Sequence, residues 1–166
     1  MSKYFNTFPV FDRGWENCYT LTTKPTLAEG PETVNADAPL RRIRNDRDRG
    51  FSAAVSVPLG PKSLLFISGE VGRDASGSIV PGGFEAEVRQ CFANIKYALE
   101  RGGAGFKDVV RITAYVKDLA DYPIYAKVRM EVFGEDWPAS ATVGVNDLLL
   151  GAKLEVDAIA VVAVPS

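Results

Sequence analysis

The chain has 166 residues, of which 46% are hydrophobic and 24% charged, and its formal net charge is -2. These values are typical of one globular domain with a short appendage, and they exclude a wholly disordered or fibrous chain. Histidine is absent, which excludes Ser-His and Cys-His triads and most zinc sites. Any acid-base chemistry must therefore use carboxylates, tyrosine, lysine or water.

The net charge, the length of the apolar runs and the cysteines indicate the compartment and the kinds of partner to expect. The small net charge provides no general attraction to nucleic acid or to an anionic membrane, and no apolar run is long enough to span a bilayer. Cys18 and Cys91 are far apart and belong to no Cys-x-x-Cys pair, which favours a reducing compartment. We expect a cytoplasmic protein that binds neither nucleic acid nor membrane.

Residues 1–50 show no lasting period of 2 or 3.6 residues. An aromatic-rich start is followed by a stretch rich in proline, acidic and small residues, and then by "RRIRNDRDRG". In this last segment, interleaved aspartates offset the arginines, which favours a solvated, self-pairing segment over an RNA contact. The sequence predicts a mostly irregular N-terminal extension over 1–50, with its aromatic residues packed on a domain over 51–166.

Regular patterns begin at Phe51. Residues 51–60 and 63–72 are β-like runs separated by a Gly-Pro turn, which predicts a hairpin. Residues 82–103 predict a helix that ends at Gly102 and Gly103. Its apolar stripe consists of Phe84, Val88, Cys91, Phe92, Ile95 and Leu99.

The second half of the chain adds a strand, a helix and two further strands. Residues 108–119 alternate apolar and polar side chains, which predicts a strand with one buried face. A helix is expected over 121–134, with Asp121 as its N-cap and Pro123 in its first turn. Residues 137–162 are two alternating runs with an apolar link, which we interpret as a second hairpin. The order β-β-α-β-α-β-β predicts an α+β fold with a mixed sheet backed by two helices.

Polar side chains recur in both final strands. Ser140 and Thr142 share one side of the first strand, and Glu155 and Asp157 share one side of the second. If the apolar residues between them face the helices, the hydroxyls and carboxylates share the outer face. This face is either a solvated surface or a carboxylate site covered by another subunit.

Three segments together resemble the Rid (YjgF) family of enamine and imine deaminases. They are "LLFISGEVG", "FANIKYALERGGAGFKDVVRITAYVKDLADY" and "WPASATVGVNDLLLGAKLEVDAIAVV", and the resemblance covers about residues 51 to 163. It implies a chorismate-mutase-like α+β fold and a homotrimer whose sheets form a central barrel. It also implies three sites in the clefts between subunits.

The resemblance extends to the site residues of the last two strands. The deaminating members read Pro-Ala-Arg-Ser-Cys-Val in the penultimate strand, and their arginine grips the substrate carboxylate. Ser140 stands at that arginine position here, and Thr142 at the cysteine position. The catalytic glutamate of the family falls on Glu155. Arg129, Arg73 and the arginines of residues 41–49 are candidates to replace the missing cation.

Further positions match the family earlier in the chain. Its Ser-Gly pair corresponds to Ser68 and Gly69, its tyrosine is replaced by Phe51, and its asparagine falls near Ala126. The resemblance therefore implies a binding set that complements the catalytic Glu155. This set consists of Ser140, Thr142, Ser68, Gly69 and Phe51.

These residues predict a hydrolytic deaminase-like enzyme acting on a small enamine or imine. Glu155 would activate the attacking water, the hydroxyls would supply neutral hydrogen bonds, and Phe51 would form an apolar wall. Neither a metal nor an organic cofactor is required. An aminomuconate-type intermediate of aromatic catabolism is one possible substrate. The alternative is a non-catalytic small-molecule-binding or regulatory trimer, and ribonuclease activity fits the acidic, histidine-free chain poorly.

Overall fold

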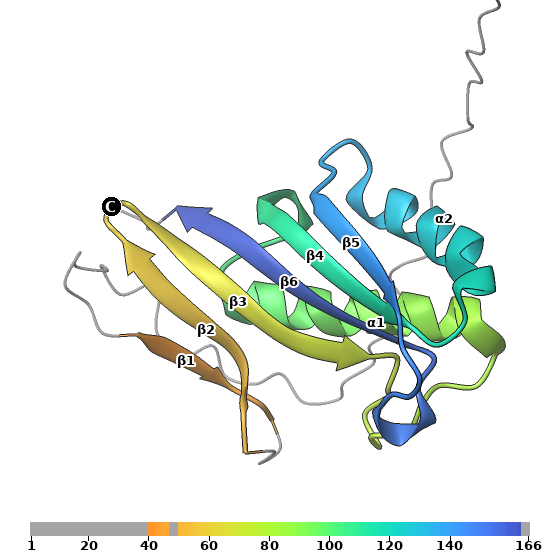
Figure 1. The fold of residues 1–166 in the computed structure, drawn as a ribbon. Helices are drawn as coiled ribbons and strands as arrows, with labels where there is room; N and C mark the ends of the chain where they lie inside the picture. Colours follow the sequence, from red (N-terminus) through yellow and green to blue (C-terminus); the bar gives the residue numbers. More distant parts are fainter. Residues whose placement is uncertain (1–39, 47–49, 164–166) are drawn as a thin grey trace, which may run out of the picture. The chain divides into compact units, whose positions relative to one another are not determined.

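A computed structural model describes residues 40–46 and 50–163, and its centre is a six-stranded sheet in the order β1-β2-β3-β6-β4-β5 (Figure 1). The strands are β1 (Arg41–Arg44), β2 (Ser52–Leu59), β3 (Lys62–Val71), β4 (Val109–Val116), β5 (Ala139–Gly144) and β6 (Leu154–Ala163). The two α-helices are α1 (Gly83–Arg101) and α2 (Tyr122–Phe133). The predicted α+β class and element types are confirmed. The predicted packing of the N-terminal aromatic residues lies outside the described residues.

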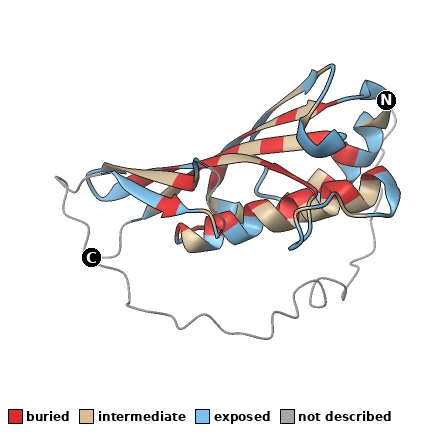
Figure 2. Cartoon of the chain, turned by 90° about the horizontal axis from the view of Figure 1, so that it is seen from below, coloured by how far each residue is buried: buried red, intermediate tan, exposed pale blue. Residues whose placement is uncertain are grey.

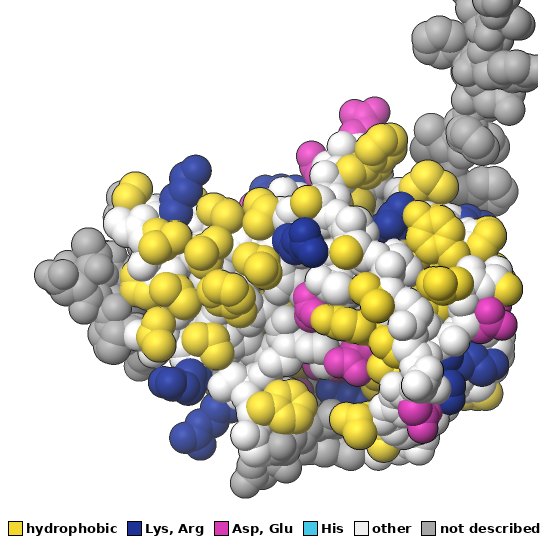
Figure 3. Space-filling view, in the orientation of Figure 1, with side chains coloured by type: hydrophobic (Ala, Val, Ile, Leu, Met, Phe, Trp, Pro, Cys, Tyr) yellow, Lys and Arg dark blue, Asp and Glu magenta, His cyan; other side chains and the backbone are white. Residues whose placement is uncertain are grey.

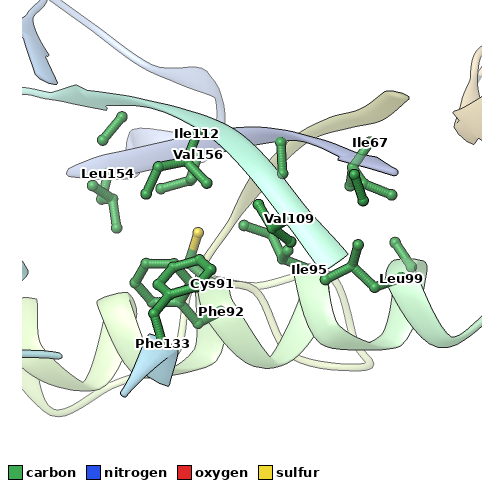
Figure 4. Packing of buried hydrophobic residues seen from close by; sticks show 14 of the residues in the cluster. Ile67, Cys91, Phe92, Ile95, Leu99, Val109, Ile112, Phe133, Leu154 and Val156 are labelled. Atoms are coloured by element: carbon green, nitrogen blue, oxygen red, sulfur yellow. The ribbon is translucent and has the colours of Figure 1, made fainter. Parts of the chain in front are cut away.

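Helix α1 packs on one face of the sheet, and the core lies between them (Figure 2). All six residues of the predicted apolar stripe are buried. Ile112, Leu154 and Val156 point from the sheet toward Cys91 and Phe92 of the helix (Figure 4). Burial of such side chains, at about 25 cal/mol per Å² of apolar surface, is the main stabilising contribution here.

Helix α2 is fixed mainly by aromatic packing against α1. Phe92 stacks on Tyr125, with ring centroids 6.2 Å apart and planes 11° apart, and meets Phe133 edge-on at 5.9 Å. The helix begins at Tyr122 with Pro123 in its first turn, as predicted. Because these contacts hold α2 against α1, space remains between α2 and strand β5.

The two C-terminal strands are not neighbours, so the prediction of a hairpin over 137–162 is wrong. Strand β5 pairs in parallel with β4 at the sheet edge, whereas β6 lies between β3 and β4 and is antiparallel to both. The link over 145–153 therefore steps past β4, which is two strand spacings or about 10 Å. The alternation of apolar and polar residues predicts a strand and its two faces, but it does not specify which strand lies beside it in the sheet.

The second face of the sheet carries no helix of the described residues. Figure 3 shows hydrophobic side chains gathered over β2, β3 and the later part of β6. We call these residues the apolar sheet patch: Val55, Val57, Leu59, Leu64, Phe66, Ile159 and Val161. Phe66 is 42% exposed and Leu59 is 54% exposed in the single chain. None of the described helices covers this patch.

Strand β1 extends the sheet before Phe51, within the segment for which the sequence shows no period. It pairs antiparallel with β2, and its only apolar side chain, Ile43, is buried. A four-residue strand with one apolar position is too short to give a periodic signal. The domain start at Phe51 stays a prediction.

Candidate functional site

Glu155 lies on the face of the sheet that no described helix covers. Its neighbours along β6, Leu154 and Val156, are fully buried on the opposite face, and Glu155 itself is half-buried. The carboxylate lies directly over Gly69 of β3, where any Cβ would collide with Oε1 of Glu155. Glycine at this position therefore makes room for the carboxylate.

A bulge in β3 forms the floor of this region. The pairing register with β6 shifts between Ile67 and Glu70, and this shift accommodates Ser68 and Gly69. The Ser68 hydroxyl donates a 2.7 Å hydrogen bond to the backbone oxygen of Ser52. It therefore ties the bulge to the start of β2, next to the exposed Phe51. In this structure Ser68 stabilises the bulge.

The surroundings of Glu155 raise the pKa of its carboxyl above the ordinary value for glutamate. Burial raises its pKa, and the negative charge of Asp157 raises it further. Asp157 also accepts a hydrogen bond of 3.2 Å from the Tyr115 hydroxyl, and its charge raises the pKa of Tyr115. No lysine or arginine of the described chain forms an ion pair with Glu155. A carboxyl with a raised pKa is suited to both accepting and returning a proton.

Ser140 and Thr142 lie on the other face of the sheet, beside α2. In the parallel pairing of β4 and β5, Ser140 is opposite Ile112 and Thr142 is opposite Ala114, and both β4 residues are buried on the helix side. The two hydroxyl residues line a hollow of about 600 Å³, which we call the helix-side hollow. Its lining residues are Leu119, Tyr122, Arg129, Ser140 and Thr142.

The prediction that hydroxyls and carboxylates share one face is therefore wrong. It assumed that Ala141 and Val143 face the helices, but β5 presents its hydroxyl residues to them. Within one subunit, the sheet separates Glu155 from Ser140 and Thr142. A pocket on one face of a single chain therefore contains only one of the two groups.

Among the candidate cations within the described residues, Arg129 alone lies beside Ser140. Its Nη1 donates a 3.2 Å hydrogen bond to Ser140 Oγ, and its guanidinium lies 5.4 Å from the centre of the Tyr125 ring. Arg73 instead forms an ion pair of 2.7 Å with Glu70, and Arg41 approaches the backbone oxygen of Gly102. The arginines at 47 and 49 lie outside the described residues.

Tyr125 is a further residue of this region that sequence reasoning missed. Its side chain is fully buried, and its hydroxyl has no hydrogen-bond partner in good geometry within the described part of the chain. Burial raises its pKa to about 12, although Arg129 and Ser140 lie close enough to lower it somewhat. A tyrosine at a buried helix position predicts core packing, so no signal in the sequence marks its hydroxyl.

Other site types find little support in residues 40–46 and 50–163. No group of three or more acidic or cysteine side chains there could hold a metal ion. No helix in this part of the chain is both long and apolar enough to cross a membrane. Cys91 is a buried free thiol that contacts the backbone oxygen of Glu70 at 3.0 Å, whereas Cys18 lies outside the described residues.

Comparison with known proteins identifies the class of this α+β fold. Residues 47–162 match the family described as Endoribonuclease L-PSP, and the chain belongs to this family, which includes the YjgF and Rid proteins. A RutC family protein of Pyrococcus horikoshii is 36% identical, over 66% of this chain and 94% of its own. The 2-iminobutanoate/2-iminopropanoate deaminase of Bos taurus is 38% identical, over 66% and 86% of the two chains.

Solved structures agree with this assignment. RidA from the Antarctic bacterium Psychrobacter sp. has a TM-score of 0.62 and 30% identity, covering 78% of this chain and 98% of its own. A Mycobacterium tuberculosis protein of the YjgF/YER057c/UK114 family has a TM-score of 0.62 and 27% identity, covering 74% and 98%. The resemblance to the Rid family is thus confirmed.

The raised pKa of Glu155 predicts how stability depends on pH. Between the ordinary pKa of glutamate, about 4.3, and the raised value, the folded chain binds more protons than the unfolded chain. The contribution of Glu155 to the free energy of unfolding is therefore greatest below the ordinary pKa and falls as pH rises through the raised one. We expect Glu155→Gln to be at least as stable as wild type at pH 7, with a difference that shrinks toward pH 4.

Urea denaturation at a series of pH values measures this difference. Asp157→Asn is the matched variant, because it removes the repulsion and should weaken the pH dependence while keeping Glu155. A Glu155→Gln protein that is clearly less stable than wild type at pH 7 would show instead that the carboxylate makes a stabilising contact.

Proposed function

We propose that the protein is a hydrolytic deaminase of a small imine or enamine, with Glu155 as the catalytic acid-base group. The observation that carries this proposal is the environment of Glu155. Its carboxyl is half-buried, has a raised pKa and occupies a space that Gly69 leaves open. The deaminase names of several relatives with 32% to 38% identity support the same chemistry.

The reaction needs only water and proton transfers. Glu155 accepts a proton from water as the water oxygen bonds to the carbon of the protonated imine, which gives a neutral tetrahedral carbinolamine. The proton then passes from Glu155 to the nitrogen. As the carbon-nitrogen bond breaks, the hydroxyl group of the carbinolamine gives its proton to Glu155, so that ammonia and a carbonyl compound leave, and Glu155 releases this proton to water. An enamine would first take a proton on carbon to become the imine. General acid-base catalysis of this kind contributes about 10² to 10⁴ in rate.

The complete site is proposed to form between subunits of a homotrimer. Glu155 with Gly69 lies on one face of the sheet, and Ser140 with Arg129 lies on the other. Two copies of the chain can bring these groups together, whereas one copy cannot. The apolar sheet patch provides a surface for the association. In this arrangement, the open sheets would face the interior of the trimer.

The substrate is less constrained than the reaction. An aminomuconate-type intermediate of aromatic catabolism remains one proposed substrate. The reason is that the positively charged side chain of the helix-side hollow, Arg129, comes from α2. The carboxylate-binding arginine of the deaminating relatives instead stands at the position of Ser140 on β5. A non-catalytic binding or regulatory trimer is the alternative. The two proposals differ in one measurable quantity, the release of ammonia.

Substitution of Glu155 tests the chemistry. Imines can be generated in the assay by an amino acid oxidase, and ammonia release is followed with and without the protein. We expect Glu155→Gln to lower the acceleration by about 10² or more, because glutamine keeps the shape but cannot accept a proton. Glu135→Gln, at an exposed position before β5, should behave as wild type. Wild-type rates in Glu155→Gln would contradict the proposed role, and no acceleration by wild type on any imine would favour the binding protein.

Substitution within the apolar sheet patch tests the assembly. Phe66 is 42% exposed in the single chain, so Phe66→Asp should fold but should not associate, because trimer formation would bury the new charge. We expect trimers for wild type and monomers for Phe66→Asp in analytical ultracentrifugation, with loss of ammonia release. Tyr97→Asp, at a 38% exposed position on α1, is the matched control and should remain trimeric. A monomeric wild-type protein would refute the trimer.

A further inference from the structure

Glu87 is a buried carboxylate on α1 that the proposed reaction does not use. Its side chain belongs to the buried set of this helix, and the residue is 3% exposed. Within the described residues, no lysine or arginine forms an ion pair with it. Burial of an unpaired carboxylate destabilises the folded chain unless hydrogen bonds compensate. The donors that Glu87 binds therefore indicate why the chain keeps it.

Both hydrogen bonds come from the start of the strand that carries Glu155. The backbone N–H of Lys153 donates to Glu87 Oε1 at 2.6 Å, and the backbone N–H of Leu154 donates to the same oxygen at 3.2 Å. Leu154 is the first residue of β6, and Glu155 follows it directly. Hydrogen bonds to a carboxylate are about twice as strong as those between neutral groups. One oxygen atom of α1 therefore fixes the backbone immediately before Glu155, and we call these two bonds the Glu87 anchor.

The link that leads into β6 is exposed at its tip and held at its end. Leu149 and Leu150 are exposed, whereas Lys153 is held from two sides. Its backbone oxygen accepts a 3.0 Å hydrogen bond from the N–H of Lys117, which follows β4, and its own N–H donates to Glu87. The Glu87 anchor is therefore the connection between this end of the link and helix α1.

Gly72 allows α1 to come close enough for the anchor. A Cβ at Gly72 would lie 2.2 Å from the backbone oxygen of Glu87 and 2.5 Å from its Cγ. Gly72 directly follows β3, and Gly69, over which the Glu155 carboxyl lies, belongs to the end of the same strand. The end of β3 thus contacts Glu87 at one glycine and Glu155 at the other.

We propose that Glu87 is a positioning residue that fixes the start of β6, so that the Glu155 carboxyl lies over Gly69. Glu87 acts only through the backbone of Lys153 and Leu154. The required property is an oxygen acceptor at this reach, so glutamine can replace glutamate but a shorter side chain cannot. The effect on turnover rests on the proposed function of Glu155, whereas the effect on its position does not.

Hydrogen exchange of the full-length protein tests the anchor without any substrate. Followed by NMR, the amides of Lys153 and Leu154 should exchange slowly in wild type and in Glu87→Gln. They should exchange about tenfold or more faster in Glu87→Ala, which lacks the acceptor. Equal exchange in all three proteins would overturn the proposal. If Glu87→Ala does not fold, Glu87→Asp takes its place in every measurement, because its side chain is one methylene too short.

The pKa of Glu155 reports its position, again without substrate. Burial is the main cause that raises this pKa, so a carboxyl that moves into water in Glu87→Ala should titrate closer to the ordinary value of about 4.3. The charged and titratable groups that face Glu155 are Asp157 on β6 and Tyr115 and Arg111 on β4, and all variants keep them. An unchanged pKa in Glu87→Ala would show that Glu87 does not position Glu155.

Kinetics connect the anchor to turnover. With an imine generated in the assay, Glu87→Ala should lower kcat about tenfold or more and change KM less than about twofold, because a displaced catalytic group affects the transition state more than binding. Glu87→Gln should keep kcat within about threefold of wild type. A Glu87→Gln protein as slow as Glu87→Ala would contradict the proposal.

Two controls on the same helix separate position from charge and from stability. Glu100→Ala removes an exposed carboxylate, and Ile95→Val weakens the buried face of α1 without removing an acceptor. Both should keep the wild-type kcat and the wild-type pKa of Glu155. A wild-type protein that releases no ammonia but passes both NMR tests would keep the anchor and remove the deaminase. Normal kcat in a Glu87→Ala protein with fast exchange would overturn the positioning role and leave the chemistry of Glu155 intact.

Discussion

The parallel pairing of β5 with β4 is the constraint on which the rest of the site depends. It sets Ser140 opposite Ile112, so the hydroxyls of β5 face the helices, while β6 turns Glu155 to the other face. The candidate site residues thus lie on two opposite surfaces of the sheet, and the hydrophobic core lies beside one of these surfaces. A site that uses both surfaces must be assembled from two chains, which links catalysis to association.

The two surfaces of the sheet differ in chemistry, and each suits a different part of the proposed reaction. Around Glu155, burial and the charge of Asp157 disfavour ionisation, and Gly69 leaves room for the carboxyl above the sheet. In the helix-side hollow, Arg129 supplies a positive charge without a carboxylate partner in the described chain. The substrate would be held by one surface, and the proton transfers would occur at the other.

Much of this architecture could be predicted from the sequence, because periodicity reports which residues of an element are buried. The apolar stripe of α1, the start of α2 and the alternation along β4 all follow from local patterns. The neighbours of β5 and β6 could not be predicted, since strand pairing depends on contacts distant in the chain. For the same reason Arg129 remained one of several candidate arginines, and the orphan hydroxyl of Tyr125 resembled ordinary core packing.

A subunit-mixing experiment tests the central claim that one site draws on two chains. Glu155→Gln and Arg129→Glu proteins, each inactive alone, are unfolded together in equal amounts, refolded into mixed trimers and assayed for ammonia release. If Glu155 of one subunit works with Arg129 of the next, about a quarter of the sites in a random mixture contain both intact groups, and about a quarter of the wild-type activity returns. If both groups serve a site within one chain, every site carries a defect. Activity that stays at the level of the separate variants, with mixed trimers shown to be present, would contradict the account.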